Sequence, residues 1–227
     1  MSAPPPAEKP CTLLLYHESN AIPQEQDFIR KLESKDDTIK MQALEQIVLH
    51  LLNGSQLPKL LMPVIKFCIN TENHRIKKLL LLYWEVVEKR NKDGTHLPEM
   101  ILVCNAMKND LQHANEYVRG STLRFLCNMK EPEILESLIP SIVQNTEHRH
   151  SYVRKNAVLT VMSVFTAFPD LIPDGPQLIE TFLYQVNNSI ITMQEANPSA
   201  KRNAFLMLFQ CDQVVDRFLS LVGPCGD

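Results

Sequence analysis

The 227-residue sequence predicts an all-α fold in which pairs of helices stack into a solenoid. The first observation behind this prediction is that apolar residues recur at helical spacing, whereas no segment alternates as a strand would. The second is a short motif, an apolar or small residue followed by a cation, near the start of five predicted helices. Its cations are Lys40, Lys77, Arg119, Arg154 and Lys201.

The spacing of this motif indicates the kind of repeat. Successive cations are 37, 42, 35 and 47 residues apart, so the loops differ in length. Tetratricopeptide and ankyrin repeats have tighter periods and signature residues that this sequence lacks, whereas HEAT and armadillo repeats run at roughly 40 to 47 residues. We therefore expect HEAT-like or armadillo-like helix pairs, each burying a face against its neighbours.

Three segments are expected along the chain. Residues 1–20 contain a Pro-rich stretch and are predicted to be disordered or extended, residues 21–222 to form a solenoid of about five helix pairs, and residues 223–227 to be a non-helical tail. The tail leaves the helical pattern and is the expected truncation point of the chain.

The first two helix pairs are predicted at residues 24–34, 36–52, 57–69 and 73–90. Pro58 falls in the first turn of its helix, where its missing N–H costs nothing. Pro63 lies deeper in the same helix and is expected to kink it. Lys89 and Arg90 are placed in the last turn of their helix, where cations are favourable.

The remaining helices are predicted at residues 97–111, 115–127, 132–146, 151–168, 176–185, 199–210 and 212–222. Pro98 and Pro132 fall in first turns, and Asn115 is the expected N-cap of its helix. The interval before Lys201 is the longest, and the extra residues are expected to form a surface loop.

Composition excludes several classes of function. A net charge of -3 and a pI near 6.2 leave no broad basic field for nucleic acid. No Gly-rich loop has the spacing of a phosphate cradle, so a nucleotide enzyme is not expected. The six cysteines form no close pair, which favours free thiols in a reducing, cytoplasmic compartment. There is no signal peptide pattern and no apolar run of membrane-spanning length, so any membrane contact is expected to be peripheral.

Four histidines, His74, His113, His148 and His150, stand near the predicted starts of helices. They have two interpretations, a metal site or polar caps for the free N–H groups of helix starts. Capping is favoured because no cysteine or carboxylate at ligand spacing completes a metal site. No metal, cofactor, small-molecule substrate or catalytic residue is predicted, and the protein is not expected to be an enzyme.

The row of cations also has two interpretations. In the first, each cation bonds loop carbonyls or acids such as Glu116 and Asp37 and ties repeats together. In the second, the row widens, with Arg124 and Arg149 beside it, into a basic strip that binds an acidic protein or anionic lipid. The candidate partner-binding residues are Lys77, Lys78, Arg119, Arg154, Lys155, Lys201 and Arg202.

Tyr83, Trp84 and Phe125 are the aromatic side chains that would anchor a partner if exposed. Their helical spacing among leucines predicts core positions instead.

Several long stretches resemble the N-terminal, adaptin-like trunk of the coatomer beta subunit family (beta-COP). They are LPEMILVCNAMKNDLQHANEYVRGSTLRFLC, NTEHRHSYVRKNAVLTVMSVF, LLNGSQLPKLLMPVIKF, IKKLLLLYWEVVEK and AKRNAFLMLF. The resemblance covers residues 11–217. Two segments depart from the family pattern: residues 186–194 look like an insertion, and residues 221–227 leave the helical pattern where the family continues its solenoid.

The resemblance implies a non-catalytic structural subunit of the coatomer (COPI) vesicle coat, acting in Golgi-to-ER and intra-Golgi protein transport. The implied partners are the delta, gamma, zeta and outer-coat subunits and a GTP-loaded Arf-family GTPase. The implied location is the cytoplasm, at the cytosolic face of Golgi membranes and COPI-coated vesicles. The alternative left open is a HEAT-repeat transport receptor or regulatory scaffold that binds peptides in its groove.

Overall fold

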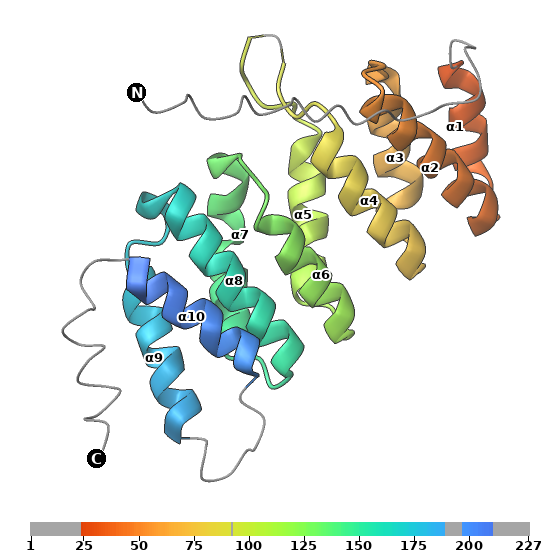
Figure 1. Ribbon diagram of the computed structural model, residues 1–227. Coiled ribbons are helices and arrows are strands. Elements are labelled where there is room, and N and C mark those ends of the chain that lie inside the picture. Colours follow the sequence, from red (N-terminus) through yellow and green to blue (C-terminus); the bar gives the residue numbers. More distant parts are fainter. Residues whose placement is uncertain (1–23, 92, 189–196, 211–227) are drawn as a thin grey trace, which may run out of the picture.

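The computed structural model describes residues 24–91, 93–188 and 197–210 (Figure 1). Within these residues the chain forms ten α-helices, two short 3-10 helices and no strand beyond one isolated antiparallel bridge between Arg90 and His96. The helices are α1 Glu25–Glu33, α2 Asp37–Leu52, α3 Leu61–Cys68, α4 His74–Val86, α5 Met100–Leu111, α6 Glu116–Leu126, α7 Pro132–Thr146, α8 Ser151–Ala167, α9 Gly175–Asn188 and α10 Pro198–Gln210. The 3-10 helices are η1 Pro58–Leu60 and η2 Pro169–Leu171. The all-α prediction is confirmed.

The helices form two layers that stack along the molecule from α1 to α10 (Figure 1). One layer, the even-numbered layer, consists of α2, α4, α6, α8 and α10, each packed on the next. The odd-numbered layer lies behind it, and each of its helices packs on the even-numbered helix that follows it in sequence. This repeated pairing is the predicted solenoid of HEAT-like or armadillo-like units.

A continuous apolar core runs between the layers through all five pairs. Tyr83, Trp84 and Phe125 belong to it, with 1%, 3% and 8% of their surface exposed, so the prediction that they are core residues is confirmed. Cys68 is buried, and Cys104 and Cys127 are half-buried free thiols, as the cysteine pattern indicated. In the described part of the chain, no helix is both long and apolar enough to cross a bilayer.

The expected kink at Pro63 is wrong. The segment begins as the 3-10 helix η1, and the α-helix starts only at Leu61, which places Pro63 in the first turn of α3. Pro63 has no N–H to bond the carbonyl four residues earlier, so it occupies a position where none is needed.

The predicted helix over residues 73–90 extends four residues too far. Helix α4 ends at Val86, and Val87 is in an extended conformation. The following residues form a hairpin-like loop that turns at Gly94, whose φ of 79° favours glycine. Lys89 and Arg90 are therefore loop residues that contact Glu131 and Glu133, and Lys89 also donates to the Glu85 carbonyl in the last turn of α4 at 3.5 Å.

Two further boundaries differ from the prediction. Pro98 precedes α5 instead of lying in its first turn. Helix α9 is longer than expected and reaches Asn188, so residues 186–188 of the supposed insertion are helical. The expectations for residues 1–20, for the rest of the insertion, for a helix over 212–222 and for the tail at 223–227 lie outside the described residues.

Candidate functional site

The starts of the even-numbered helices share one local design. The N-cap side chains Asp36, Asn73, Asn115, His150 and Asn197 each accept a hydrogen bond from the backbone N–H two residues later. These bonds satisfy N–H groups that a helix start leaves without a partner. The cation of the motif follows each cap four residues later, which explains the regular register of the row.

A second polar residue precedes four of these caps. The side chains of Ser34, Thr71, His113 and His148 accept a bond from the backbone N–H of the cap itself, at 3.0 or 3.1 Å. The capping interpretation is thus confirmed for His113, His148 and His150. His74 is different, because it is the first residue of α4 and is exposed, and Thr71 holds the position that matches His113.

Three cations of the row bond the end of the next odd-numbered helix. Lys40 Nζ donates to the Phe67 carbonyl of α3 at 2.9 Å, and Lys77 Nζ pairs with Asp110 of α5 at 2.6 Å. Arg119 donates to the side-chain oxygen of Asn145 of α7 at 3.2 Å. Each bond joins one repeat to the following one, so the row ties repeats together at one edge of the solenoid. The acids expected for this role have other contacts: Asp37 accepts from Asn73, and Glu116 faces Arg149 at 3.8 Å.

Arg119 and Arg154 also fasten their own loops. Arg119 donates to the carbonyls of Gln112 and His113, and Arg154 to those of His148 and Arg149. A guanidinium presents several donors in a fixed plane, which suits this bridging of successive carbonyls.

Asn145 is the residue that sequence reasoning missed. It is 2% exposed, donates to the carbonyls of Leu111 and Ser141 at 3.0 and 2.7 Å, and accepts from Arg119. A buried amide with all of these partners fixes α5, α6 and α7 relative to one another. A signal existed, because Asn145 and Asp110 occupy the same position near the ends of α7 and α5.

Among the remaining candidate partner-binding residues, Lys201 belongs to the row, and Lys78, Lys155 and Arg202 lie beside it. Lys78 and Arg202 are exposed, and Lys155 and Lys201 are half-buried. The seven candidates come from α4, α6, α8 and α10 and do not gather at one point. Their role in binding a partner stays a prediction.

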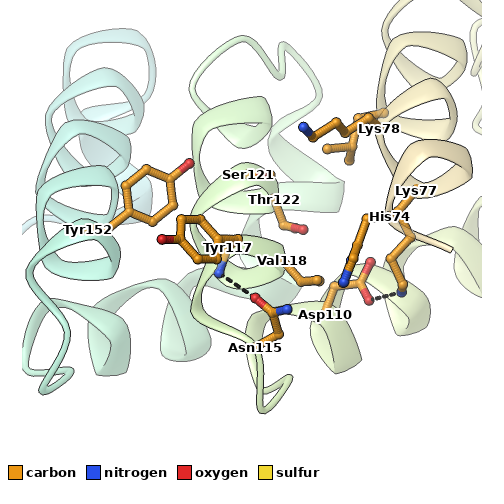
Figure 2. A pocket seen from close by; sticks show the side chains of 11 residues that line it. His74, Lys77, Lys78, Asp110, Asn115, Tyr117, Val118, Ser121, Thr122 and Tyr152 are labelled. Atoms are coloured by element: carbon orange, nitrogen blue, oxygen red, sulfur yellow. Dashed lines mark hydrogen bonds and ion pairs between the residues drawn. The ribbon is translucent and has the colours of Figure 1, made fainter. Parts of the chain in front are cut away.

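An open groove of about 310 Å³ lies where α4 meets α6, next to Lys77 and Lys78 (Figure 2). Figure 2 shows Lys78 on the α4 wall and Tyr117 and Tyr152 on the opposite side, with the Lys77–Asp110 ion pair at one end. Leu81 and Val118 supply apolar lining, and Ser121 and Thr122 supply hydroxyl groups. The groove thus combines an exposed cation, an apolar wall and an aromatic platform.

Gly120 explains how the platform is built. The Tyr152 ring of α8 lies against Gly120 of α6 so closely that an added Cβ would stand 2.2 Å from a ring carbon. Tyr117 is 66% exposed, and its ring centroid is 5.5 Å from that of Tyr152. Two neighbouring tyrosines with polar tips are a common feature of protein-binding surfaces.

A second groove, of about 490 Å³, lies where the loop after α2 faces the hairpin-like loop. Met62 and Leu57 line it together with Glu88 and Glu99. Its cations are already engaged, because Lys59 pairs with Glu25 and Arg90 pairs with Glu133.

The described residues contain no group of metal-ligating side chains. Burial raises the pKa of the Cys68 thiol to about 11 and also raises the pKa of Cys104 and of Cys127, which keeps these thiols protonated and poorly nucleophilic.

Comparison with known proteins identifies the family. The model of the adaptin N-terminal region matches residues 18–223. The chain is 48% identical to the coatomer subunit beta of Dictyostelium discoideum over 204 residues, which is 90% of this chain and 21% of that protein. It is 46% identical to that of Drosophila melanogaster over 221 residues, which is 97% of this chain and 22% of that protein.

The solved structures that resemble it include a designed armadillo repeat protein in complex with the peptide (KR)4. That match has a TM-score of 0.54 and 15% sequence identity, and covers 80% of this chain and 79% of that one. At this identity the match bears on the fold alone. The sequence relatives are more informative, although the chain spans only about a fifth of their length. The chain belongs to the coatomer beta subunit family, and its residues 18–223 match the adaptin N-terminal region.

Proposed function

We propose that this chain is a non-catalytic structural subunit of the COPI vesicle coat, acting in Golgi-to-ER and intra-Golgi protein transport. The observation that carries the proposal is the 46% to 48% identity with coatomer beta subunits over nearly the whole chain. A stacked array of helix pairs supports it, because such arrays offer long surfaces to protein partners. The proposed location is the cytosolic face of Golgi membranes and of COPI-coated vesicles.

The proposed partners are the delta, gamma, zeta and outer-coat subunits of coatomer. Affinity capture of the tagged chain from cells, followed by mass spectrometry, tests this. Enrichment of several coat subunits over a tagged chain carrying Leu123→Ala, which weakens the fold, is the expected result. Equal recovery from both samples contradicts the proposal.

A GTP-loaded Arf-family GTPase is the proposed partner of the groove at the α4–α6 junction. Exposed Lys78 and Tyr117 flank the apolar Leu81 and Val118, so a partner with an acidic rim and an apolar centre is complementary to the groove. Lys77 and Arg119 belong to the same basic strip, but their bonds to Asp110 and Asn145 hold repeats together. Reversing their charge would disturb the fold as well as the surface, so they are poor test sites.

Lys78→Glu combined with Tyr117→Ala tests the groove as the GTPase site without removing a contact that holds repeats together. Loss of a central anchor and of an opposite charge is expected to weaken binding to the GTP-loaded GTPase about tenfold or more. Lys108→Glu on α5 is the control, because it makes the same charge change at an exposed position outside the groove. Unchanged affinity of the folded double variant, measured by titration calorimetry, would place the GTPase elsewhere.

The alternative function is a transport receptor or regulatory scaffold that binds peptides. The groove favours it, because its apolar Leu81 and Val118 and its exposed Tyr117 offer a surface to an extended peptide as well as to a folded protein. Fluorescence anisotropy with labelled acidic and basic peptides of equal length distinguishes the two. Micromolar binding that Tyr117→Ala abolishes, without recovery of coat subunits from cells, favours the alternative.

A further inference from the structure

We use the word joint for the loop that leads into an even-numbered helix, together with its capping residues. Histidines replace the usual capping residues at two consecutive joints of the solenoid. Before α4 the paired caps are Thr71 and Asn73, and before α2 they are Ser34 and Asp36. Before α6 the first member of the pair is His113, and before α8 both members are histidines, His148 and His150. The geometry is the same in all four joints, so the imidazoles have taken over the task of an amide, hydroxyl or carboxylate oxygen.

In all three imidazole rings, Nδ1 is the atom that accepts the hydrogen bond. Nδ1 of His113 accepts from the N–H of Asn115 at 3.0 Å, Nδ1 of His148 from that of His150 at 3.0 Å, and Nδ1 of His150 from that of Tyr152 at 3.3 Å. A ring nitrogen accepts a bond only while it carries no proton, so each ring must be the neutral Nε2–H tautomer. A proton on Nδ1 would face a backbone N–H, donor against donor.

We propose that His113, His148 and His150 make the α5–α6 and α7–α8 joints sensitive to acid, because protonation converts three hydrogen-bond acceptors at helix starts into donors. The joints before α2 and α4 are capped by groups that keep their acceptor at mildly acidic pH. The central part of the solenoid therefore loosens first as pH falls, while the first two pairs keep their caps.

The charges around His148 favour this behaviour. Burial lowers its pKa below the ordinary value of 6.5, and Arg119 of α6 and Arg149 of its own loop lower it further. Glu116 of α6 acts in the opposite direction, and His150 adds a smaller lowering effect. Because the folded pKa is depressed, the unfolded chain takes up the proton first, so the stabilisation is present above pH about 6.5 and is lost as pH falls below it.

The other two rings also lie near charged groups. His113 Nε2 lies 3.8 Å from the exposed carboxylate of Glu72, and the guanidinium of Arg119 bonds the His113 carbonyl. His150 lies against the Tyr117 ring, with a centroid distance of 6.5 Å, and near Glu116. Both joints also place Tyr117 and Tyr152 two residues after the caps, where their N–H groups bond the cap side chains, so loosening the joints disturbs the aromatic platform of the groove.

The test replaces the histidines with the residues that the chain itself uses at the α3–α4 joint. The variant carries His113→Thr, His148→Thr and His150→Asn, and thermal unfolding of the whole chain is followed by circular dichroism at pH 7.5 and pH 5.5. Loss of the caps is expected to lower the wild-type midpoint by on the order of 5 °C between these pH values. The variant is expected to show less than half of that fall.

His74→Asn is the matched control, because His74 is an exposed histidine that caps no helix, and it should keep the wild-type pH dependence. An equal fall in the triple variant and in wild type overturns the proposal. Should the triple variant not fold, imidazole nitrogen NMR of wild type decides. The proposal is supported if the Nδ1 atoms are unprotonated at pH 7.5 and become protonated over the same pH range in which the Asn115, His150 and Tyr152 amides lose protection against hydrogen exchange. Nδ1–H tautomers at pH 7.5 overturn it.

Discussion

The α4–α6 and α6–α8 junctions are neighbours in the even-numbered layer. Their helices start with the same motif, but one junction is open and the other is closely packed. At the α6–α8 junction, Thr160 donates to the Leu123 carbonyl at 2.8 Å and the Tyr152 ring fills the space over Gly120. At the α4–α6 junction the helices pack less closely, and the groove of about 310 Å³ opens beside them. The shared motif at the helix starts therefore does not decide whether a junction closes; the side chains further along the helices do.

The open junction is held at its two ends instead. The Lys77–Asp110 ion pair closes one end, and the hairpin-like loop after α4 contacts the start of α7 at the other. There Lys89 lies 3.8 Å from Glu131, while Arg90 and His96 both contact Glu133. Polar contacts at the edges keep the repeats in register where the middle of the junction is open.

The largest expected difference between the junctions comes from shortening one leucine in each. Leu123→Ala removes a fully buried side chain of α6 and should cost about 3 kcal/mol through lost burial and a cavity. Leu81→Ala shortens a half-buried side chain in the groove and should cost about 1 kcal/mol. Thermal midpoints should fall by about 9 °C and 3 °C. Equal shifts would mean that the groove is closed in solution.

Asn145→Ala is expected to cause the second largest loss of stability. It leaves the Leu111 carbonyl without its buried donor and takes an acceptor from Arg119, at an expected cost of about 2 kcal/mol. Asn105→Ala, at an exposed position of α5, should change stability by less than about 0.5 kcal/mol. Chemical denaturation measures both, and an Asn145→Ala cost as small as that of the control would show that the amide does not tie the repeats.

The contact between Gly120 and Tyr152 predicts that the effect of Gly120→Ala on stability depends on whether the Tyr152 ring is present. Gly120→Ala alone should gain no stability, because the new methyl group displaces the Tyr152 ring. In a Tyr152→Ala background the same change should stabilise by about 1 kcal/mol, the usual preference of a helix for alanine. A double-mutant cycle followed by thermal unfolding checks this. Equal effects in both backgrounds would rule out the ring as the obstacle.

The smallest effect is expected at the end of the open junction, where the groups are exposed. The hydrogen bond from His96 to the Glu133 carboxylate lowers the pKa of Glu133 to about 2, and the backbone N–H of Glu133 and the charge of Arg90 act in the same direction. A depressed carboxyl pKa stabilises the fold above the unfolded value of about 4.5, and this is lost as pH falls toward 2. Between pH 5 and pH 2.5, urea midpoints of wild type should therefore fall more than those of Glu133→Gln. Glu136→Gln, exposed on the same helix, should behave as wild type.

Most of the helices were readable from the chain, because their signals are local. Asn115 acts as the cap that its sequence context indicated, and the cation four residues later fixed the repeat register. The errors came where a local signal competed with a partner far along the chain. Lys89 and Arg90 looked like helix-end cations, but they contact Glu131 and Glu133, more than 40 residues away.

The sequence by itself determined the solenoid, its register and the polar design of its joints, since helix periodicity, caps and the recurring cation depend on neighbours within a few residues. Only the tertiary structure decided which cations are committed to the fold and which are exposed. Lys77 and Lys78 are adjacent in sequence, yet one points to Asp110 and the other to the groove, because successive residues on a helix face different directions.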